Sequence, residues 1–156
     1  MTSRILPTLA LLSLVCAGCQ SSPLKQPQGP PPLTYDIQVN HIQIVVRLSE
    51  ISFGEDSTTV SLAITNGRRQ AIDIKTNNGI VLYDDQKHQY NLSIPPDTPT
   101  ITIQPATTLK GKFVFIGRLS PKARTINLVI ETRKNFGNKY SIGTINLNNI
   151  DVTKKQ

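Results

Sequence analysis

Tryptophan is absent from this 156-residue chain, and tyrosine and phenylalanine contribute only four residues each. This scarcity argues against a transmembrane β-barrel, because such barrels carry girdles of aromatic residues at both membrane interfaces. The only two cysteines are Cys16 and Cys19, so the rest of the chain can hold neither a disulfide framework nor a Cys-Cys or Cys-His metal site. The body of the chain is therefore expected to fold without covalent or metal cross-links.

Catalytic signals are also scarce. The sequence has two histidines, His41 and His88, and it lacks both a G-x-S-x-G motif and a glycine-rich loop of the kind that cradles phosphates. A nucleophile, a base and an orienting acid cannot be assigned together from so few candidates. We therefore expect a protein that is not an enzyme, with no catalytic residues and no cofactor.

The chain is basic, with 17 Lys and Arg against 10 Asp and Glu. Its formal net charge of +7 becomes +6 if Arg4 is removed with the signal segment described below. The basic residues are scattered and several lie in expected turns, without interleaved aromatics, so we expect no nucleic-acid binding. Such a balance suits either simple solubility or an anionic partner.

The first nineteen residues read MTSRILPTLALLSLVCAGC and have the layout of an export signal. Arg4 gives a positive start, and an eleven-residue, mostly apolar run follows from Ile5 to Val15. That run suits a signal peptide and is too short to span about 30 Å of hydrocarbon as a helix. The segment is therefore expected to direct the chain out of the cytoplasm.

The end of this segment, Cys16-Ala17-Gly18-Cys19, resembles the lipobox of bacterial lipoproteins, although Cys16 stands where Leu is usual. The resemblance implies that residues 1–18 are removed and that Cys19 carries diacylglycerol and an acyl chain such as palmitate. An ordinary cleaved signal with a free Cys19, or an uncleaved anchor, are the alternatives. By analogy with enteric bacteria, Gln20 in place of Asp suggests the outer membrane, with the chain in the periplasm or at the cell surface.

A proline-rich stretch follows the expected lipid site. Residues 20–33 contain five Pro, two Ser and one Gly, a composition that favours an extended chain without internal hydrogen bonds. Fourteen residues at about 3.1 Å each reach roughly 40 Å. We expect a signal peptide at 1–18, a lipidated Cys and linker at 19–34, a β domain at 35–152 and a basic tail at 153–156.

The body of the chain alternates apolar and polar residues with a period of two. Runs such as Val60-Ser-Leu-Ala-Ile64 and Ile126-Asn-Leu-Val-Ile130 are separated by turn signals, including Asn66-Gly67 and Pro95-Pro96-Asp97. This pattern predicts about eight to ten short strands in an all-β, antiparallel, immunoglobulin-like sandwich. A ligand-holding calyx is the competing fold.

Two breaks in the alternation predict bulges within strands. In one, Leu48 gives way to Ile51; in the other, Ile142 gives way to Ile145 across Gly143. An extra residue on one strand shifts the following side chains to the opposite face of the sheet.

Three runs, 60–66, 80–84 and 109–115, are similar to immunoglobulin-like domains of bacterial lipoproteins and secreted proteins, including the FxLYD type and related domains of unknown function. They show a strand ending in Thr-Asn, a Leu-Tyr-Asp before a turn, and a Gly-x-Phe-x-Phe strand. Lys87 and Ala106 stand where those domains usually have Gly. The resemblance implies a sandwich fold and transfers no catalytic residue.

Function is predicted largely by elimination. We expect an envelope-anchored interaction or accessory module that binds an envelope protein, with the Arg68–Arg69 and Arg133–Lys134 loops as docking points. Such a module could serve a secretion or surface assembly. The alternative is a small-ligand or metal-ion binder, for which Asp84, Asp85 and His88 are weak candidates for ligands across a turn.

Overall fold

The computed structural model describes residues 30–75, 78–94, 100–132 and 142–155. These residues form ten strands and no helix: β1 (Leu33–His41), β2 (Ile44–Phe53), β3 (Ser57–Asn66), β4 (Ile72–Lys75), β5 (Ile80–Asp84), β6 (Gln89–Asn91), β7 (Thr100–Ile103), β8 (Thr107–Ile116), β9 (Thr125–Glu131) and β10 (Thr144–Asp151). A search of the same residues accordingly finds no helix with the length and apolar character to cross a membrane. The all-β prediction is confirmed, and the signal segment and Cys19 lie outside the described residues.

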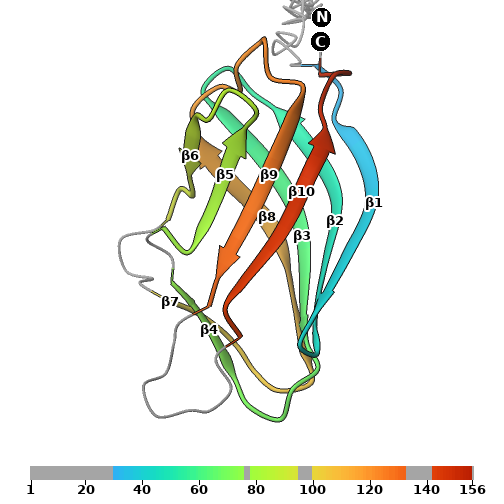
Figure 1. The fold of residues 1–156 in the computed structure, drawn as a ribbon, viewed down its shortest axis with the longest axis vertical. Coiled ribbons are helices and arrows are strands. Elements are labelled where there is room, and N and C mark those ends of the chain that lie inside the picture. The colour runs from blue at the N-terminus through green and yellow to red at the C-terminus, as the bar shows by residue number, and fades with distance from the viewer. Residues whose placement is uncertain (1–29, 76–77, 95–99, 133–141, 156) are drawn as a thin grey trace, which may run out of the picture.

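The strands form two four-stranded antiparallel sheets that face each other, with a small β4–β7 pair beside them (Figure 1). The first sheet has the order β1-β2-β3-β8 and the second has β10-β9-β5-β6. Immunoglobulin folds order strands A-B-E in one sheet and G-F-C, with C′ in some, in the other. Because β2-β3-β8 and β10-β9-β5-β6 follow that order, the predicted immunoglobulin-like sandwich is confirmed. Strand β1 is an addition beside β2.

The core lies between the two sheets and consists of the apolar residues of each alternating run. In β3, Val60, Leu62 and Ile64 are buried, while the residues between them point outward. β-Branched and aromatic side chains pack well on a pleated surface, and burying each contributes about 1.5–3 kcal/mol. Phe115 is the largest fully buried side chain.

The first predicted bulge is confirmed and the second is wrong in position. Pairing between β2 and β3 shifts register between Leu48 and Glu50, so Ser49 is the extra residue that restores Ile51 to the core. Gly143 instead precedes β10 with φ +74°, and its carbonyl accepts hydrogen bonds from Thr132. The bulge of β10 lies later, between Leu147 and Ile150.

Strand β1 begins and β10 ends at the same pole of the sandwich, which we call the terminal pole (Figure 1). Along one side, β1 and β10 are joined by side chains. The Tyr35 hydroxyl donates to the Asp151 carbonyl at 2.5 Å, and His41 Nε2 lies 2.8 Å from the Ile142 carbonyl oxygen. Burial, with the nearby Asp151 charge, raises the pKa of Tyr35 to about 12.

Candidate functional site

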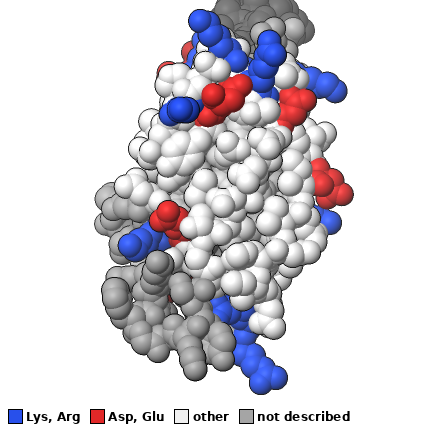
Figure 2. All heavy atoms as spheres, in the orientation of Figure 1, with Lys and Arg blue, Asp and Glu red and all other residues white. Residues whose placement is uncertain are grey.

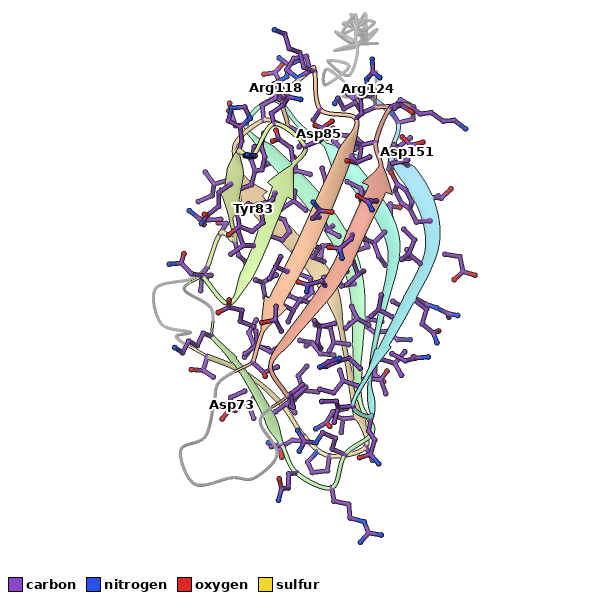
Figure 3. All side chains as sticks on the ribbon, viewed as in Figure 1. Asp73, Tyr83, Asp85, Arg118, Arg124 and Asp151 are labelled. Atoms are coloured by element: carbon purple, nitrogen blue, oxygen red, sulfur yellow. The ribbon has the colours of Figure 1, made fainter. Side chains whose placement is uncertain are left out.

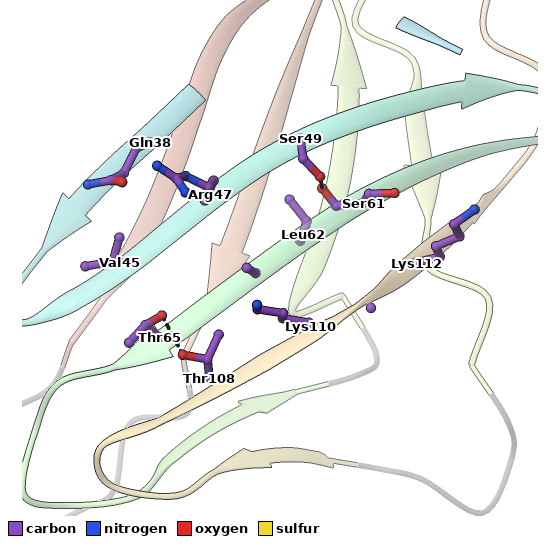
Figure 4. Close-up of a pocket in the computed structure, with 12 residues that line it drawn as sticks. Gln38, Val45, Arg47, Ser49, Ser61, Leu62, Thr65, Thr108, Lys110 and Lys112 are labelled. Atoms are coloured by element: carbon purple, nitrogen blue, oxygen red, sulfur yellow. Dashed lines mark hydrogen bonds between the residues drawn. The ribbon is translucent and has the colours of Figure 1, made fainter. Parts of the chain in front are cut away.

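The outer face of the first sheet is hollowed into an open trough of about 740 Å³. Because side chains alternate along a strand, outward residues of β1, β2, β3 and β8 form most of its lining, whereas Leu62 and Gly111 belong to the inward rows of β3 and β8. Its lining is polar and mostly small: Gln38, Val45, Arg47, Ser49, Ser61, Leu62, Ala63, Thr65, Thr108, Lys110, Gly111 and Lys112. Figure 4 shows these side chains spread over the four strands.

The register of the sheet places one small residue between two cations. Arg47 on β2 pairs with Ala63 on β3, and Ala63 pairs with Lys110 on β8. Neighbouring strands lie about 4.8 Å apart, so the backbones of Arg47 and Lys110 are separated by roughly 10 Å. Only the methyl group of Ala63 rises between them, which leaves a slot between the two positive side chains.

Hydroxyl groups flank this slot on both sides. Thr65 Oγ1 lies 2.8 Å from Thr108 Oγ1, and Ser49 Oγ donates to the Ser61 carbonyl at 3.4 Å. The bulge at Ser49 turns its hydroxyl into this face. The trough therefore offers hydrogen-bonding groups beside each of its cations (Figure 4).

The lining of the trough includes Arg47, Lys110 and Lys112 and no Asp or Glu, and two acids stand at its border: Asp36 beside Arg47, and Glu50 across Ser61 from Lys112. Arg47 Nε forms an ion pair with Asp36 Oδ1 at 3.5 Å, and the two side chains are 57% and 85% exposed. Exposed pairs of this kind hold their partners weakly, so Arg47 remains available to another anion.

The second sheet offers a contrast. Figure 2 views the molecule from that side and shows a central face almost without charged residues, with the charges gathered toward the poles and rims. Outward residues there include Asn127 on β9 and Asn146 on β10. Of the two outer faces, the first sheet's carries the cations.

The sequence-predicted docking loops lie elsewhere. Arg68 and Arg69 follow β3 at the pole opposite the terminal pole, where Arg69 is exposed and the Arg68 amide donates to Asn66 Oδ1 at 3.0 Å. Arg133 and Lys134 lie outside the described residues. Docking at either loop therefore stays a prediction, and Arg68 and Arg69 are not among the residues that line the trough.

The metal candidates lie at the terminal pole, where the structure joins two of the three. Asp84 ends β5 with a fully buried carboxylate, and its Oδ2 lies 3.0 Å from His88 Nδ1. The other oxygen accepts the amides of Gln86 and His88 at 2.9 and 2.8 Å, and Tyr90 donates its hydroxyl to Oδ2 at 3.0 Å. The Asp84 carboxylate thus accepts two backbone amides of its own turn and the Tyr90 hydroxyl of β6, and it forms an ion pair with His88 when that residue is protonated.

Asp85 turns away from that pair toward the neighbouring loop. Its carboxylate accepts the Arg124 amide at 3.2 and 3.3 Å, and Figure 3 shows both residues at the terminal pole. Across the described ranges, no three His, Cys, Asp or Glu side chains come together as a metal site would require. Metal binding by Asp84, Asp85 and His88 stays a prediction, while their hydrogen bonds give them a clear role in fixing the turn.

Burial and hydrogen bonding have opposing effects on the pKa of Asp84 in this turn. Burial would raise the pKa of Asp84, but hydrogen bonds from His88 and Tyr90, with the charge on His88, hold it below the usual value of 3.8. Burial also raises the pKa of Tyr90, and its hydroxyl accepts the Ser120 amide at 3.1 Å. Asp84 and Tyr90 therefore tie the β5–β6 turn to the loop before β9.

The C-terminal segment closes the same pole. Lys155 is buried and its ammonium group donates to the Ala123 carbonyl, whereas Lys154 is exposed. Burial lowers the pKa of Lys155, and the Asp85 and Asp84 carboxylates oppose that shift. Part of the predicted basic tail is therefore packed against the domain.

Comparison with known proteins supports the fold. No family model and no curated protein matches the chain. Among solved structures, it is similar to the yjhA protein of Bacillus subtilis (TM-score 0.55, 11% identity, 74% of this chain and 96% of that one). The ycdA protein of the same organism, described as a candidate lipoprotein, matches with TM-score 0.53 and 14% identity over 75% of this chain and 39% of its own. A functionally unknown protein from Listeria monocytogenes matches with TM-score 0.51 and 13% identity, over 78% and 87%.

These likenesses define the class of domain and leave its activity open. This chain spans less than half the length of the ycdA protein, and identities of 11–14% relate the folds alone. The class is an all-β, antiparallel sandwich with immunoglobulin-like strand order. Function must be argued from the site, because one fold supports many functions.

Proposed function

We propose that this chain is a lipid-anchored, non-catalytic binding module of the cell envelope, which holds another envelope component on the outer face of its first sheet. One observation carries the proposal: an open trough of about 740 Å³ with three cations and no acid in its lining. Small-molecule pockets are usually enclosed and mostly apolar. An open trough on a rigid sheet suits a larger partner laid across it.

The proposed anchor agrees with the shape of the domain. The lipobox-like segment ends at Cys19, and β1 begins at Leu33 at the terminal pole. The intervening linker can reach roughly 40 Å, so the trough would stand clear of the lipid head groups. Gln20 favours the outer membrane as the site of attachment. The likeness to ycdA, a candidate lipoprotein, supports the lipid anchor and does not bear on which membrane holds it.

The lipid attachment can be tested with Cys19→Ser. Since one acyl chain gives only marginal membrane binding and several give stable anchoring, we expect this variant to move from the membrane fraction to the soluble fraction. Intact mass of the wild-type protein should show a diacylglyceryl group on Cys19. Cys16→Ser, which leaves the proposed site in place, is the matched control and should stay with the membrane. Equal fractionation of wild type and Cys19→Ser would contradict the anchor.

The binding face can be tested by photo-crosslinking in living cells. A photoreactive phenylalanine analogue replaces Ser61 at the centre of the trough or Asn146 on the outer face of the second sheet. We expect a defined, heavier adduct from position 61 and little from position 146, because only the first site lies on the proposed binding face. Equal adducts from both positions, or none from position 61 with efficient activation, would argue against the trough.

A further inference from the structure

We infer that the trough binds a linear anionic glycopolymer, that is, an extended chain of sugars or polyols carrying a phosphate or carboxylate at regular intervals. This inference rests on the proposed function, because it names the ligand of the same trough. It depends on three features of the lining: the spacing of the cations, the small floor between them, and the kinds of side chain that are missing.

The cations form a grid that suits repeated negative charges. Lys110 and Lys112 point outward from the same strand, and two residues along a strand span about 6.8 Å. Arg47 stands across Ala63 from Lys110, at roughly 10 Å between backbones. An extended chain with several charges can contact each of these cations where it stands, without drawing the three side chains together.

The floor of the trough favours a narrow, hydroxyl-rich chain. Ala63 keeps the centre low, and four hydroxyl side chains border it at Ser49, Ser61, Thr65 and Thr108. Hydroxyl groups both donate and accept hydrogen bonds, which matches the hydroxyl groups of sugars and polyols. The described lining therefore pairs charge recognition with hydroxyl recognition along one path.

The missing side chains argue against the other classes of ligand. The lining contains no Trp, Tyr or Phe, so among the usual anchors of a protein interface it has Arg47 alone, and it offers no aromatic on which a base or a neutral sugar ring could stack. Strands β2 and β3 are hydrogen-bonded on both sides, so a peptide cannot be added to this face as an extra strand. A flexible polyanion held by charges and hydroxyls needs none of these features.

The inference can be tested with the full chain carrying Cys19→Ser, titrated with oligomers of polyglycerol phosphate and of polygalacturonate by calorimetry. These two probes distinguish a phosphate-bearing from a carboxylate-bearing polymer, and binding of either one supports the inference. Binding should weaken when NaCl rises from about 50 to about 300 mM, because exposed charges are screened. Poly-glutamate and a single-stranded oligonucleotide of equal charge should bind at least about tenfold more weakly, since they lack the polyol hydroxyls.

Three variants locate the binding. Arg47→Ser with Lys110→Ser should weaken it by at least about tenfold, whereas the charge-matched pair Lys87→Ser with Lys122→Ser, at the terminal pole, should change it less than about twofold. Ala63→Leu keeps every charge but fills the slot, and we expect at least a fivefold loss, on the order of 1 kcal/mol. Circular dichroism confirms that each variant is folded.

The inference would be overturned if the two charge-matched pairs of substitutions reduced the binding affinity equally, or if all four polyanions bound equally well. Either result would indicate general charge attraction. Absence of binding by both glycopolymers would also overturn it. The crosslinking probe at Ser61 then separates the two proposals. A protein adduct from that position would leave the binding face standing with a different ligand, and no adduct would remove both proposals.

Discussion

Replacing Asn66 with Asp is expected to reduce the free energy of unfolding by about 3 kcal/mol. Asn66 is fully buried at the end of β3, and its amide nitrogen donates to three backbone carbonyls, those of Gln70, Ile103 and Gln104, at 2.8, 3.0 and 3.2 Å. A carboxylate would face these three oxygen atoms with lone pairs in place of protons. Urea unfolding followed by circular dichroism measures the change.

A surface residue supplies the control for this substitution. Asn148→Asp makes the same chemical change at an exposed position of β10, and we expect it to alter stability by less than about 0.5 kcal/mol. The loss of stability caused by Asn66→Asp should become smaller as the pH falls. Burial raises the pKa of the new carboxyl, so this group takes up a proton at a higher pH in the folded protein than in the unfolded chain. Equal effects of the two variants would show that the buried amide does not hold β3 to the segment after β7.

Removing the Asp84 carboxylate as Asp84→Ala is expected to cost about 3 kcal/mol of stability. The substitution leaves the Gln86 and His88 amides and the Tyr90 hydroxyl without their acceptor. Thermal unfolding or urea denaturation at neutral pH measures the loss. Asp85→Ala is the matched control, because Asp85 is exposed and accepts one amide with long hydrogen bonds. A similar loss in both variants would contradict the role given to Asp84.

The same carboxylate makes stability depend on pH. The pKa of Asp84 is lower in the folded protein than its usual 3.8, so its stabilising contribution is complete above that value. It is lost as the pH falls below the unfolded value and through the folded one. Asp84→Asn should therefore flatten the stability profile below about pH 4. If the unfolding free energy of the variant falls with pH as steeply as that of the wild type, groups other than Asp84 cause the acid sensitivity.

Much of the fold follows from local features of the sequence. The alternation in 60–64 correctly predicts which side of β3 is buried, and the break after Leu48 correctly predicts a bulge. Lys87 and Ala106, identified as replacements for turn glycines, adopt φ of 68° and 54°, the conformation that glycine tolerates best. Strand alternation, bulges and turn conformations depend on residues that are close together in the chain, so they can be predicted from the sequence.

Asn66-Gly67 correctly marks the end of a strand, but this local signal does not show which strands meet there. Asn66-Gly67 is a strong hairpin signal, yet β3 and β4 belong to different sheets, and Gly67 instead lies against the Gln43 carbonyl, which a Cβ would approach to 2.8 Å. The tight hairpin is formed by Ile42-Gln43, with φ of 44° and 64°. Ile42 is 54% exposed at this turn, so it is an apolar residue whose place is set by the turn and not by the core.

The trough could not be predicted from the sequence. Arg47, Ala63 and Lys110 become neighbours only through the registers of β2 with β3 and of β3 with β8, and the latter pairing joins strands far apart in the chain. Basic doublets such as Arg68–Arg69 draw attention because their charges are adjacent in sequence. The cations of the trough are single outward residues, and each resembles an ordinary solvated strand position on its own.

The crosslinking comparison between Ser61 and Asn146 tests the central claim most directly, namely that the outer face of the first sheet is the binding face. We predict an adduct at position 61 that falls sharply when Arg47→Ser and Lys110→Ser are introduced with it, and no comparable adduct at position 146. An adduct at position 61 that persists without both cations, or an equal one at position 146, would contradict the claim.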